Sequence, residues 1–527
     1  MSSTELVKKP DEIREQASRI LASSMFKKSK ILSNFLNYIV NETINGNEQQ
    51  LKEYIIAVNV LKKKSDFNPQ LDAIVRIHAR RLRQLLIDYY KSDGGNDAIF
   101  ISVPKGRYIP NFEINNSTSS AFADNKNPIV EEVESKPVIA VLPFKNFQKN
   151  EKSDVICSIL SHDLSIELSR FPEIGVISNY STQFAQETIS DINSIISNLG
   201  VDYLITGSCI LEGEKAKINI ELSNCLSKKV LWAEKYNCDD IENNSFQSYD
   251  KVVRKVTAIV CGFFGLIYRT TLNAHVPNDY DQLYAIYWHN RYHRQYTEEA
   301  FHESLKAVEL GLKKNPDNPL LTAFKGELYL NLITMDVEGE IDFLKYGTSL
   351  VKHAITIDPN NQHAYQVKAW ANLLSHNKTE LYRSMEKCIA INPNNASYVG
   401  QMGFGYICAG DYEKGLELMS ESVQLNPYFN WNLNIGFCLY FMHNEEFEEA
   451  FHWAEKINRR GVFWDPLFRA STLGFLNRKE EANKAYKELL LLSPAFPEKA
   501  KKLVNLYILD KRLQEQILRG LGLAGMK

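Results

Sequence analysis

The chain has 527 residues, 44% of them hydrophobic and 24% charged, an ordinary composition for a globular protein of roughly three or four domains. A chain of this length buries a sizeable core, which excludes a need for disulfide staples. Its formal net charge of −3 conceals an asymmetry, because residues 1–115 hold 18 Lys and Arg against 13 Asp and Glu, whereas the rest hold 43 against 51. The basic first segment suggests that one end of the protein meets a polyanion.

Neither secretion nor a membrane span is predicted. The eight cysteines form no C-x-x-C pair, which indicates buried thiols in a reducing compartment rather than a disulfide framework or a zinc site. The opening "MSSTELVKKPDEIREQ" lacks the apolar core of a signal peptide. The longest apolar run, residues 256–268, falls short of the ~20 residues that a spanning helix needs, so we expect a buried helix there. We therefore expect a soluble, cytoplasmic protein without membrane contact.

Residues 10–114 are predicted to be helical first and strand-like later. Two helices are expected in "NFLNYIVNETING" (34–46) and "LKEYIIAVNVLK" (51–62), and a third at 72–90 after a turn in "FNPQLD". The segment "DGGNDAIFISVPKGRYIPNF" indicates strand, tight turn, strand. The polar, Ser- and Asn-rich residues 115–136 predict a flexible linker.

Residues 137–272 are predicted to form an α/β domain. "PVIAVLPF" opens it as a buried strand that Pro143 ends, and the spacing of Ile156, Leu160, Leu164 and Leu168 predicts a helix. A strand at "IGVIS" and a helix at "DINSIISNLG" follow, and then three strands in "DYLITGSCIL", "KAKINIELSN" and "KVLWAEKY". Strands that first alternate with helices and then cluster fit an α/β or α+β sheet.

Residues 278–527 are predicted to be an all-α solenoid. Proline follows Asn or Asp at positions 316, 359, 393 and 427, and the last two intervals are 34 residues each. The first interval is longer, which suggests an insertion near "TMDVEGEID". A 34-residue period is the signature of tetratricopeptide repeats. Gly403 and Tyr406 stand at the small and aromatic positions of a first helix, and Ala482 and Tyr486 at those of a second.

Three resemblances accompany these patterns. The last zone resembles tetratricopeptide-repeat proteins. The segments "VIAVLPFKNF", "LSHDLSIELSRF", "LGVDYLITGSCI" and "LWAEKY" resemble the TolB-like domain that precedes such repeats in many bacterial proteins. Residues 30–112 resemble the winged-helix-like domain at the start of bacterial regulators that combine cyclase or TolB-like modules with repeats. No segment resembles a cyclase catalytic domain, so that activity is not implied. The expected fold is a multidomain α+β chain with an N-terminal winged helix-turn-helix, a central TolB-like domain and a C-terminal tetratricopeptide-repeat solenoid.

The stretch "AIVRIHARRLRQLLIDYY" (73–90) carries two stripes. In a helix, Arg76, Arg80 and Arg83 share an i, i+4, i+7 stripe, with Arg81 at its boundary. A second, core-facing stripe is predicted for Val75, Ala79, Leu82, Leu86 and Tyr89. Guanidinium groups suit both phosphate oxygens and the edge of guanine, and an α-helix fits the major groove.

The hairpin after this helix adds Lys105 and Arg107 at its tip. A basic helix followed by a basic wing is the layout of a winged helix-turn-helix, in which the helix enters the major groove and the wing touches the backbone or minor groove. The segment also resembles the output domain of response regulators. The alternative is a solvated basic face on a structural helix, with Arg81 in an internal ion pair with Glu53 or Asp88.

Other motifs are weaker. "GLGLAG" (520–525) has no preceding strand, as a dinucleotide site would need. His289 and His293 have zinc-compatible spacing, but no third ligand is evident, so we expect aromatic packing of the repeats. No catalytic constellation stands out, and we expect neither an enzyme nor a bound cofactor or metal.

Taken together, the sequence predicts a DNA-binding transcriptional regulator. Its partners would be double-stranded DNA and a protein or peptide in the groove of the repeats, while the middle domain or the repeats sense a ligand. A homodimer would serve this function, because one small module rarely binds DNA specifically enough alone. The alternative is a signalling scaffold that binds proteins and not DNA.

Overall fold

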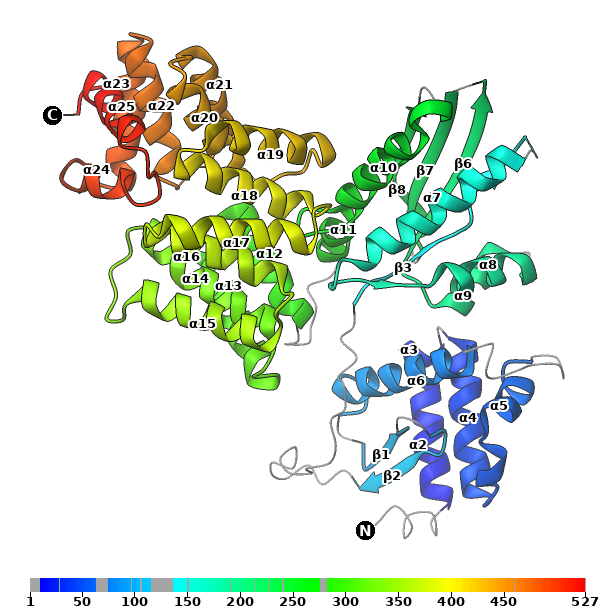
Figure 1. The fold of residues 1–527 in the computed structure, drawn as a ribbon. Helices are drawn as coiled ribbons and strands as arrows, with labels where there is room; N and C mark the ends of the chain where they lie inside the picture. The colour runs from blue at the N-terminus through cyan, green and yellow to red at the C-terminus, as the bar shows by residue number, and fades with distance from the viewer. Residues whose placement is uncertain are drawn as a thin grey trace. The chain divides into compact units, whose positions relative to one another are not determined.

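The computed structural model describes residues 10–526 apart from 28, 63–73, 96, 105–106, 115–135, 149–150, 190, 214, 226, 239–240, 275–281 and 460. The chain divides into two compact units (Figure 1). The first holds residues 1–132 and 187–200, and the second holds residues 133–186 and 201–527. The expected linker and the turn at "FNPQLD" lie outside the described residues, apart from Lys136.

The first unit is a set of helices followed by a two-stranded hairpin. In chain order these elements are α2 (Pro10–Ala22), α3 (Ser24–Lys27), α4 (Lys30–Ile44), η1 (Glu48–Gln50), α5 (Glu53–Asn59), α6 (Ile74–Lys91), β1 (Ile99–Ser102) and β2 (Asn111–Ile114). The three helices expected from the sequence correspond to α4, α5 and α6. Fully buried Ile13, Phe35, Ile39 and Leu82 share one core with the hairpin residues Ile101 and Phe112.

The hairpin differs from the expected tight turn. β1 and β2 pair antiparallel from Ile99 opposite Ile114 to Ser102 opposite Asn111, so residues 103–110 form a longer connection. Pro104 and Pro110 flank this connection, and because proline has no N–H to donate, neither residue can extend the ladder. The segment Glu187–Gly200, which contains α9 (Ile192–Leu199), also groups with the first unit.

The second unit begins with a mixed sheet in the order β5-β3-β6-β7-β8, with β4 paired to β6. The strands are β3 (Val138–Val141), β4 (Lys145–Asn146), β5 (Gly175–Val176), β6 (Tyr203–Glu212), β7 (Lys215–Asn224) and β8 (Lys229–Cys238). β3 runs parallel to β5 and β6, whereas β6, β7 and β8 form an antiparallel meander. This confirms the predicted change from alternating elements to clustered strands.

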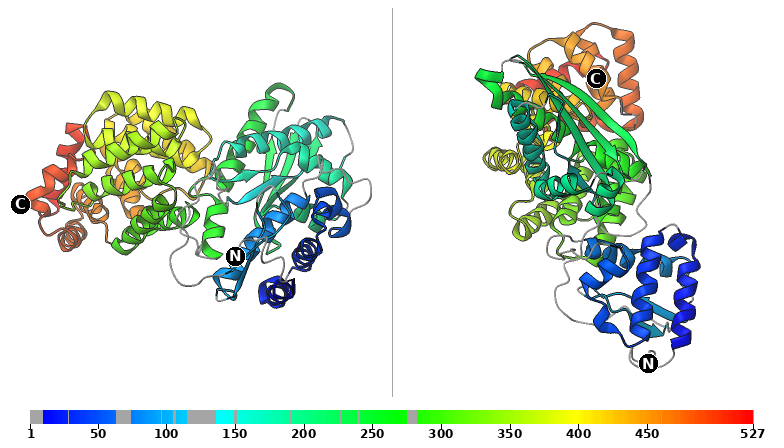
Figure 2. Two further views of the ribbon diagram at one scale, coloured as in Figure 1. Left: turned by 90° about the horizontal axis from the view of Figure 1, so that it is seen from below. Right: turned by 90° about the vertical axis from the view of Figure 1, so that its right-hand side faces the viewer.

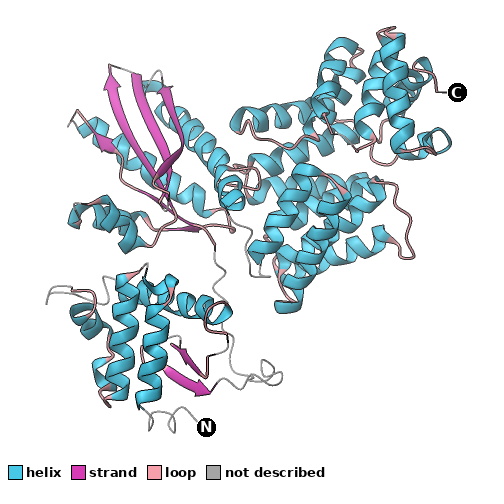
Figure 3. Cartoon of the chain, turned by 180° about the vertical axis from the view of Figure 1, so that it is seen from behind, coloured by secondary structure: helices cyan, strands magenta, loops and turns pink. Residues whose placement is uncertain are grey.

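Two long helices, α7 (Glu151–Ser169) and α10 (Ile241–Val260), cover one face of this sheet, and the view from behind shows the other face in front (Figure 3). Alternation along β7 explains the arrangement, because Ala216, Ile218, Ile220 and Leu222 are buried while Lys215 and Lys217 are exposed. The α7 residues predicted from helical spacing are all buried. A short helix, α8 (Asn179–Thr188), follows β5.

The apolar run 256–268 is buried, but it is not the single helix that we expected. α10 ends at Val260, and α11 begins at Leu266 and extends to Ala274. Gly262 has a φ of +78°, which breaks the helix, and a Cβ on Gly265 would lie 2.1 Å from the carbonyl oxygen of Cys261. Two glycines therefore convert one apolar run into a helix–turn–helix.

The rest of the second unit is an array of antiparallel helix pairs that follow one another in chain order (Figure 2). The paired helices are α12 (Gln282–Gln295) and α13 (Glu298–Lys314), α14 (Pro319–Thr334) and α15 (Phe343–Ile357), α16 (Gln362–Leu374) and α17 (Lys378–Ile391), α18 (Ala396–Ala409) and α19 (Tyr412–Leu425), α20 (Leu433–His443) and α21 (Phe447–Ile457), and α22 (Trp464–Phe475) and α23 (Lys479–Leu492). Two helices end the array, α24 (Phe496–Val504) and α25 (Lys511–Leu523).

The recurring prolines follow the ends of second helices. Pro316, Pro359, Pro393, Pro427 and Pro494 each stand two positions after the last residue of α13, α15, α17, α19 and α23. The suggested insertion coincides with the connection between α14 and α15. The "GLGLAG" motif lies at the end of α25 rather than after a strand. No described helix of the chain is long and apolar enough to cross a membrane.

Candidate functional site

Helix α6 has the core-facing stripe that its sequence predicted. Val75, Ala79, Leu82, Leu86 and Tyr89 are all at most 3% exposed. Positions 76, 80, 83 and 87 lie along another stripe of the same helix. Ile87, the last member of that stripe, is 43% exposed, so the stripe faces solvent at this end.

Arg83 joins α6 to the connection between β1 and β2. Its Nε donates to the carbonyl oxygen of Val103 at 2.9 Å, and its Nη2 donates to those of Pro104 at 3.0 Å and Arg107 at 3.1 Å. A guanidinium presents its N–H groups as a planar fork, which suits several carbonyls at once. Arg83 therefore ties α6 to described residues on both sides of the connection between β1 and β2.

Two tyrosines at the other end of α6 fasten the hairpin at its base. The Tyr90 hydroxyl accepts from the Ile101 N–H at 2.8 Å and donates to the Ile99 carbonyl at 3.2 Å. Tyr89 donates to the Asp97 carboxylate at 2.6 Å, which also accepts from Gln16 on α2 at 2.6 Å. Helix and hairpin are thus held at both ends, and they form one surface.

The predicted DNA-contacting residues are distributed over this surface as follows. Arg76, Arg80 and Arg81 lie on α6, but their side chains are outside the described part of the structure, as is Lys105. Arg107 is exposed, and its backbone carbonyl accepts one of the Arg83 hydrogen bonds. Among the predicted residues, the geometry therefore joins the side chain of Arg83 to the backbone of Arg107.

A second site lies inside the repeat array, where a cavity of about 120 Å³ is enclosed mainly by the first helices of successive pairs. Aromatic rings supply much of its wall, including those of Trp370, Phe404, Trp431, Trp464 and Tyr507. Four titratable side chains are among its polar lining residues: His289 and His293 on α12, Glu327 on α14 and His363 on α16. The space is large enough for several waters or a small ligand.

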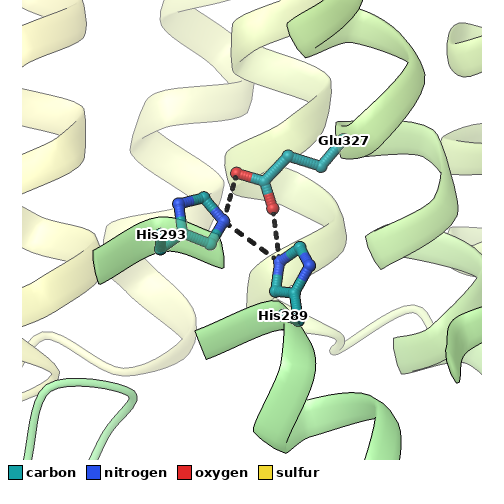
Figure 4. A group of neighbouring side chains, drawn as sticks. All are labelled: His289, His293 and Glu327. Atoms are coloured by element: carbon teal, nitrogen blue, oxygen red, sulfur yellow. Dashed lines mark hydrogen bonds and ion pairs between the residues drawn. The ribbon is translucent and has the colours of Figure 1, made fainter. Parts of the chain in front are cut away.

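These polar side chains converge closely (Figure 4). The Nε2 atom of His289 lies 3.0 Å from Oε2 of Glu327 and 3.1 Å from Nε2 of His293, which is itself 3.4 Å from Oε1 of Glu327. The Nε2 atom of His363 lies 3.1 Å from the same Oε2. Figure 4 shows the rings of His289 and His293 facing one carboxylate from a single helix.

The cluster is buried, and it is negatively charged when its histidines are neutral. Side-chain exposure is 2% for His289 and 6% for Glu327, and no Lys or Arg is among the described residues lining the cavity. Burial lowers the pKa of His289 to about 3, despite the neighbouring carboxylate. Burial works to raise the pKa of Glu327, but the histidines together outweigh it and hold that pKa well below its usual range. A buried carboxylate in this setting needs a cationic partner.

Comparison with known proteins addresses the middle of the chain. Residues 135–255 match the second domain of HilA/YgeH-like transcriptional regulators. A curated relative, "Putative adenylate cyclase 3" of Rhizobium meliloti (strain 1021), is 29% identical over 124 residues, which are 23% of this chain and 20% of the relative. The chain therefore spans about a fifth of that relative's length. The matched regulator domain contains the whole sheet and most of α10.

Solved structures resemble parts of the chain. The tetratricopeptide-repeat protein YrrB, described with an unusual peptide-binding site, has 12% identity and a TM-score of 0.24. The match covers 41% of this chain and 99% of the YrrB chain. TolB from Acinetobacter baumannii has 18% identity and a TM-score of 0.18, and the match covers 28% of this chain and 30% of the TolB chain. Yeast Tom70 has 16% identity and a TM-score of 0.27, and the match covers 53% of this chain and 55% of the Tom70 chain.

The histidine–glutamate cluster was missed by the sequence analysis. His289 does join the expected aromatic packing, since its ring stacks on Phe324 with centroids 3.8 Å apart. No third partner for the pair was evident in the sequence, whereas the structure places Glu327 beside both imidazoles. A signal existed: His289, Glu327 and His363 are 38 and 36 residues apart, close to one repeat, so they fall on successive first helices.

Proposed function

We propose that this protein is a DNA-binding transcriptional regulator whose first unit acts as a winged helix-turn-helix. The match of residues 135–255 to a domain of transcriptional regulators carries the proposal. The helices and fastened hairpin that precede this domain supply the elements that a winged helix uses. The repeat array would bind a protein or peptide partner or sense a ligand, and we assign the chain no catalytic role.

In this proposal α6 enters the major groove. Arg76 and Arg80 would contact phosphates or guanine edges, and Lys105 and Arg107 would contact the backbone beside the wing. The burial of the stripe from Val75 to Tyr89 supports this orientation, because it directs the remaining faces of α6 away from the core. Arg83 would act mainly by positioning the wing, given its three bonds to loop carbonyls.

The test is binding of the full chain to mixed-sequence duplex DNA over a range of salt concentrations. Several phosphate contacts should make the logarithm of the association constant fall steeply with the logarithm of salt, with a slope of about −0.9 per contact on B-DNA. Arg76→Gln and Arg80→Gln should each weaken binding and reduce the slope by about one contact.

Arg14→Gln is the matched control, because Arg14 is a half-exposed arginine on α2, outside the proposed surface. It should leave the slope unchanged. Negligible binding by the unmodified chain at low salt, or equal losses in all three variants, would contradict the proposal. Either result would favour the alternative, a protein-binding scaffold.

A further inference from the structure

The cluster of His289, His293 and Glu327 has the donor atoms of a metal site, and it lies far along the chain from the proposed DNA-binding surface. Two imidazole Nε2 atoms and a carboxylate meet within hydrogen-bond distance of one another. They lie within 4.8 Å of each other and could hold one ion. The inference made from them does not depend on the proposed function.

Protons alone do not satisfy this arrangement. A hydrogen bond between the two Nε2 atoms, 3.1 Å apart, needs one to donate and the other to accept. The accepting nitrogen then has no N–H left to donate to the carboxylate, which lies 3.0 Å from His289 and 3.4 Å from His293. One of the three contacts is therefore repulsive whenever the carboxylate is ionised. A single cation among the three groups would accept lone pairs from all of them.

The spacing fits a tetrahedral transition-metal ion. Zinc–nitrogen and zinc–oxygen bonds of about 2.0–2.2 Å place tetrahedral ligands about 3.3–3.6 Å apart, so the two shorter separations here would open by a few tenths of an ångström around an ion. The three ligand separations here are 3.0, 3.1 and 3.4 Å. The i, i+4 spacing of His289 and His293 on α12 puts both rings on one face of the helix, and Glu327 comes from α14 opposite.

A neighbouring hydroxyl group favours the tautomer of His289 that binds metal. The Nδ1 atom of His289 lies 3.5 Å from Oγ of buried Ser304. A hydroxyl that accepts from Nδ1–H leaves Nε2 with a free lone pair. The fourth coordination position would face the cavity, where the amide nitrogen of Asn290, 2% exposed, has no hydrogen-bond partner.

We infer that the repeat cavity binds one divalent transition-metal ion of the Zn²⁺ type through His289, His293 and Glu327, with one coordination position open to the cavity. Imidazole ligands favour Zn²⁺ over Mg²⁺ or Ca²⁺, which prefer oxygen. An open position would allow a small molecule in the cavity to coordinate the ion, as His₂Glu sites with three protein ligands permit.

The test uses the full chain, purified without a histidine tag and stripped with a chelator. Zn²⁺ uptake is measured by competition with a chromophoric chelator and by metal analysis, and Co²⁺ absorption reports coordination by nitrogen ligands. We expect one equivalent of Zn²⁺, tetrahedral Co²⁺ bands, a raised melting temperature with Zn²⁺, and no effect of Mg²⁺.

Variants assign the ligands. His293→Gln and Glu327→Gln should weaken Zn²⁺ binding by more than about 100-fold, whereas Ser304→Ala, which removes only an outer hydrogen bond, should weaken it roughly 10-fold. His302→Gln is the control, because His302 has an exposed i, i+4 pair with Glu298 and is not in the cavity. Its binding should match the unmodified chain.

Failure of the unmodified chain to bind Zn²⁺ at micromolar concentrations would overturn the inference without reference to any variant. Binding of one full equivalent of Zn²⁺ by both the His293→Gln and the Glu327→Gln variant would also overturn the inference, because the ion would then be bound elsewhere. Circular dichroism of each stripped variant checks the fold. DNA binding is scored separately, so the outcome of one test does not decide the other.

Discussion

The guanidinium of Arg83 donates hydrogen bonds to three carbonyl oxygens of the loop between β1 and β2, those of Val103, Pro104 and Arg107. A side chain in a predicted DNA-contacting stripe therefore also determines the shape of the adjacent wing. Substitution of Arg83 changes both charge and hairpin geometry, so it cannot separate the two roles. Arg76 and Arg80 are the better positions for the DNA-binding test.

Arg83→Gln should loosen the hairpin tip. The substitution removes a charged donor from partly buried carbonyls, which costs about 1–3 kcal/mol of unfolding free energy. Hydrogen exchange at the amides of Arg107 and Tyr108 should become faster. Arg107→Gln is the matched control, because the exposed Arg107 contributes only its backbone carbonyl to these bonds. Equal exchange in the two variants would refute the structural role of Arg83.

Glu173 is a buried carboxyl in the turn after α7, and it predicts a dependence of stability on pH. Burial raises its pKa from 4.5 to about 7, although Lys136 and a backbone hydrogen bond oppose the shift. Between these values the folded state binds a proton that the unfolded state releases, so stability is lost as the pH rises through this window. The loss is on the order of 3 kcal/mol at full ionisation.

Glu173→Gln should therefore stabilise the protein at pH 8 and have little effect at pH 5. The measurement is the melting temperature of the unmodified chain and the variant at both values. Glu151→Gln, at an exposed position at the start of α7, should show no such difference. A Glu173→Gln effect that is the same at both pH values would show that the carboxyl is ionised throughout.

Residue patterns predicted the buried stripes well because helical periodicity reports burial directly. All five core positions of α6 and all four of α7 are buried as expected. Glu327 was not found, because the signal that joins it to His289 and His363 is a spacing of about one repeat, and no local pattern within its own apolar helix α14 shows that spacing. Such convergence depends on how the pairs stack, which a local pattern does not contain.

At the scale of elements, the middle domain and the repeats meet through polar side chains near the Asn-Pro loops. On α10, Arg254 donates from Nε to Asn394 at 2.7 Å and from Nη2 to Glu421 on α19 at 2.5 Å. Asn394 in turn donates to Glu167 on α7 at 2.6 Å. Asn426, which precedes Pro427, donates to the carbonyl of Ala258 at 3.0 Å. Asn426, which marked a repeat in the sequence, and Asn394, which follows Pro393, thus also contact the middle domain.

Arg254→Ala should weaken this contact by about 1–2 kcal/mol, because it removes a charged donor shared by two acceptors that are only partly exposed. Thermal unfolding should shift down by a few degrees, and hydrogen exchange should rise at Asn394 and Asn395. Lys251→Ala, on the exposed side of the same helix, provides the comparison. A shift of the same size in both variants would mean that the lost charge, and not the contact, is responsible.

The two elements that departed from expectation both depend on residues that interrupt a pattern. The apolar run at 256–268 has helical composition throughout, and only the backbone conformation at Gly262 and Gly265 divides it. The hairpin connection is longer than a tight turn because Pro104 and Pro110 stop the ladder on both sides. Composition indicated the type of each element, whereas single glycines and prolines determined where the elements ended.

At the scale of the second unit, the repeat array brings distant segments together around the cavity. The Nε1 group of Trp464 on α22 donates to the carbonyl of Thr334 at the end of α14 at 3.2 Å. Two residues farther along, Asp336 pairs with Lys499 of α24 at 2.8 Å. Neither contact could be predicted from the period, because a repeat pattern describes each pair and its neighbour but not contacts across 130 or more residues.

These two contacts fasten residues 334–336, at and just after the end of α14, to two helices late in the array, α22 and α24, and we predict that their effects are not additive. Trp464→Phe keeps the aromatic ring and removes the donor, and Lys499→Met keeps the length of the side chain and removes the charge. Either contact alone should hold the segments together, so each single variant should lower the melting temperature slightly. The double variant should lower it by more than the sum, because only then do the segments separate. Hydrogen exchange at Met335–Val337 would report the separation directly.

The control is a second double-mutant cycle in which Lys502→Met takes the place of Lys499→Met. Lys502 is at an exposed position on α24, so the effects in this cycle should be additive. Additive effects in the first cycle would instead mean that each contact acts on its own, and that packing of the apolar cavity wall keeps the array closed.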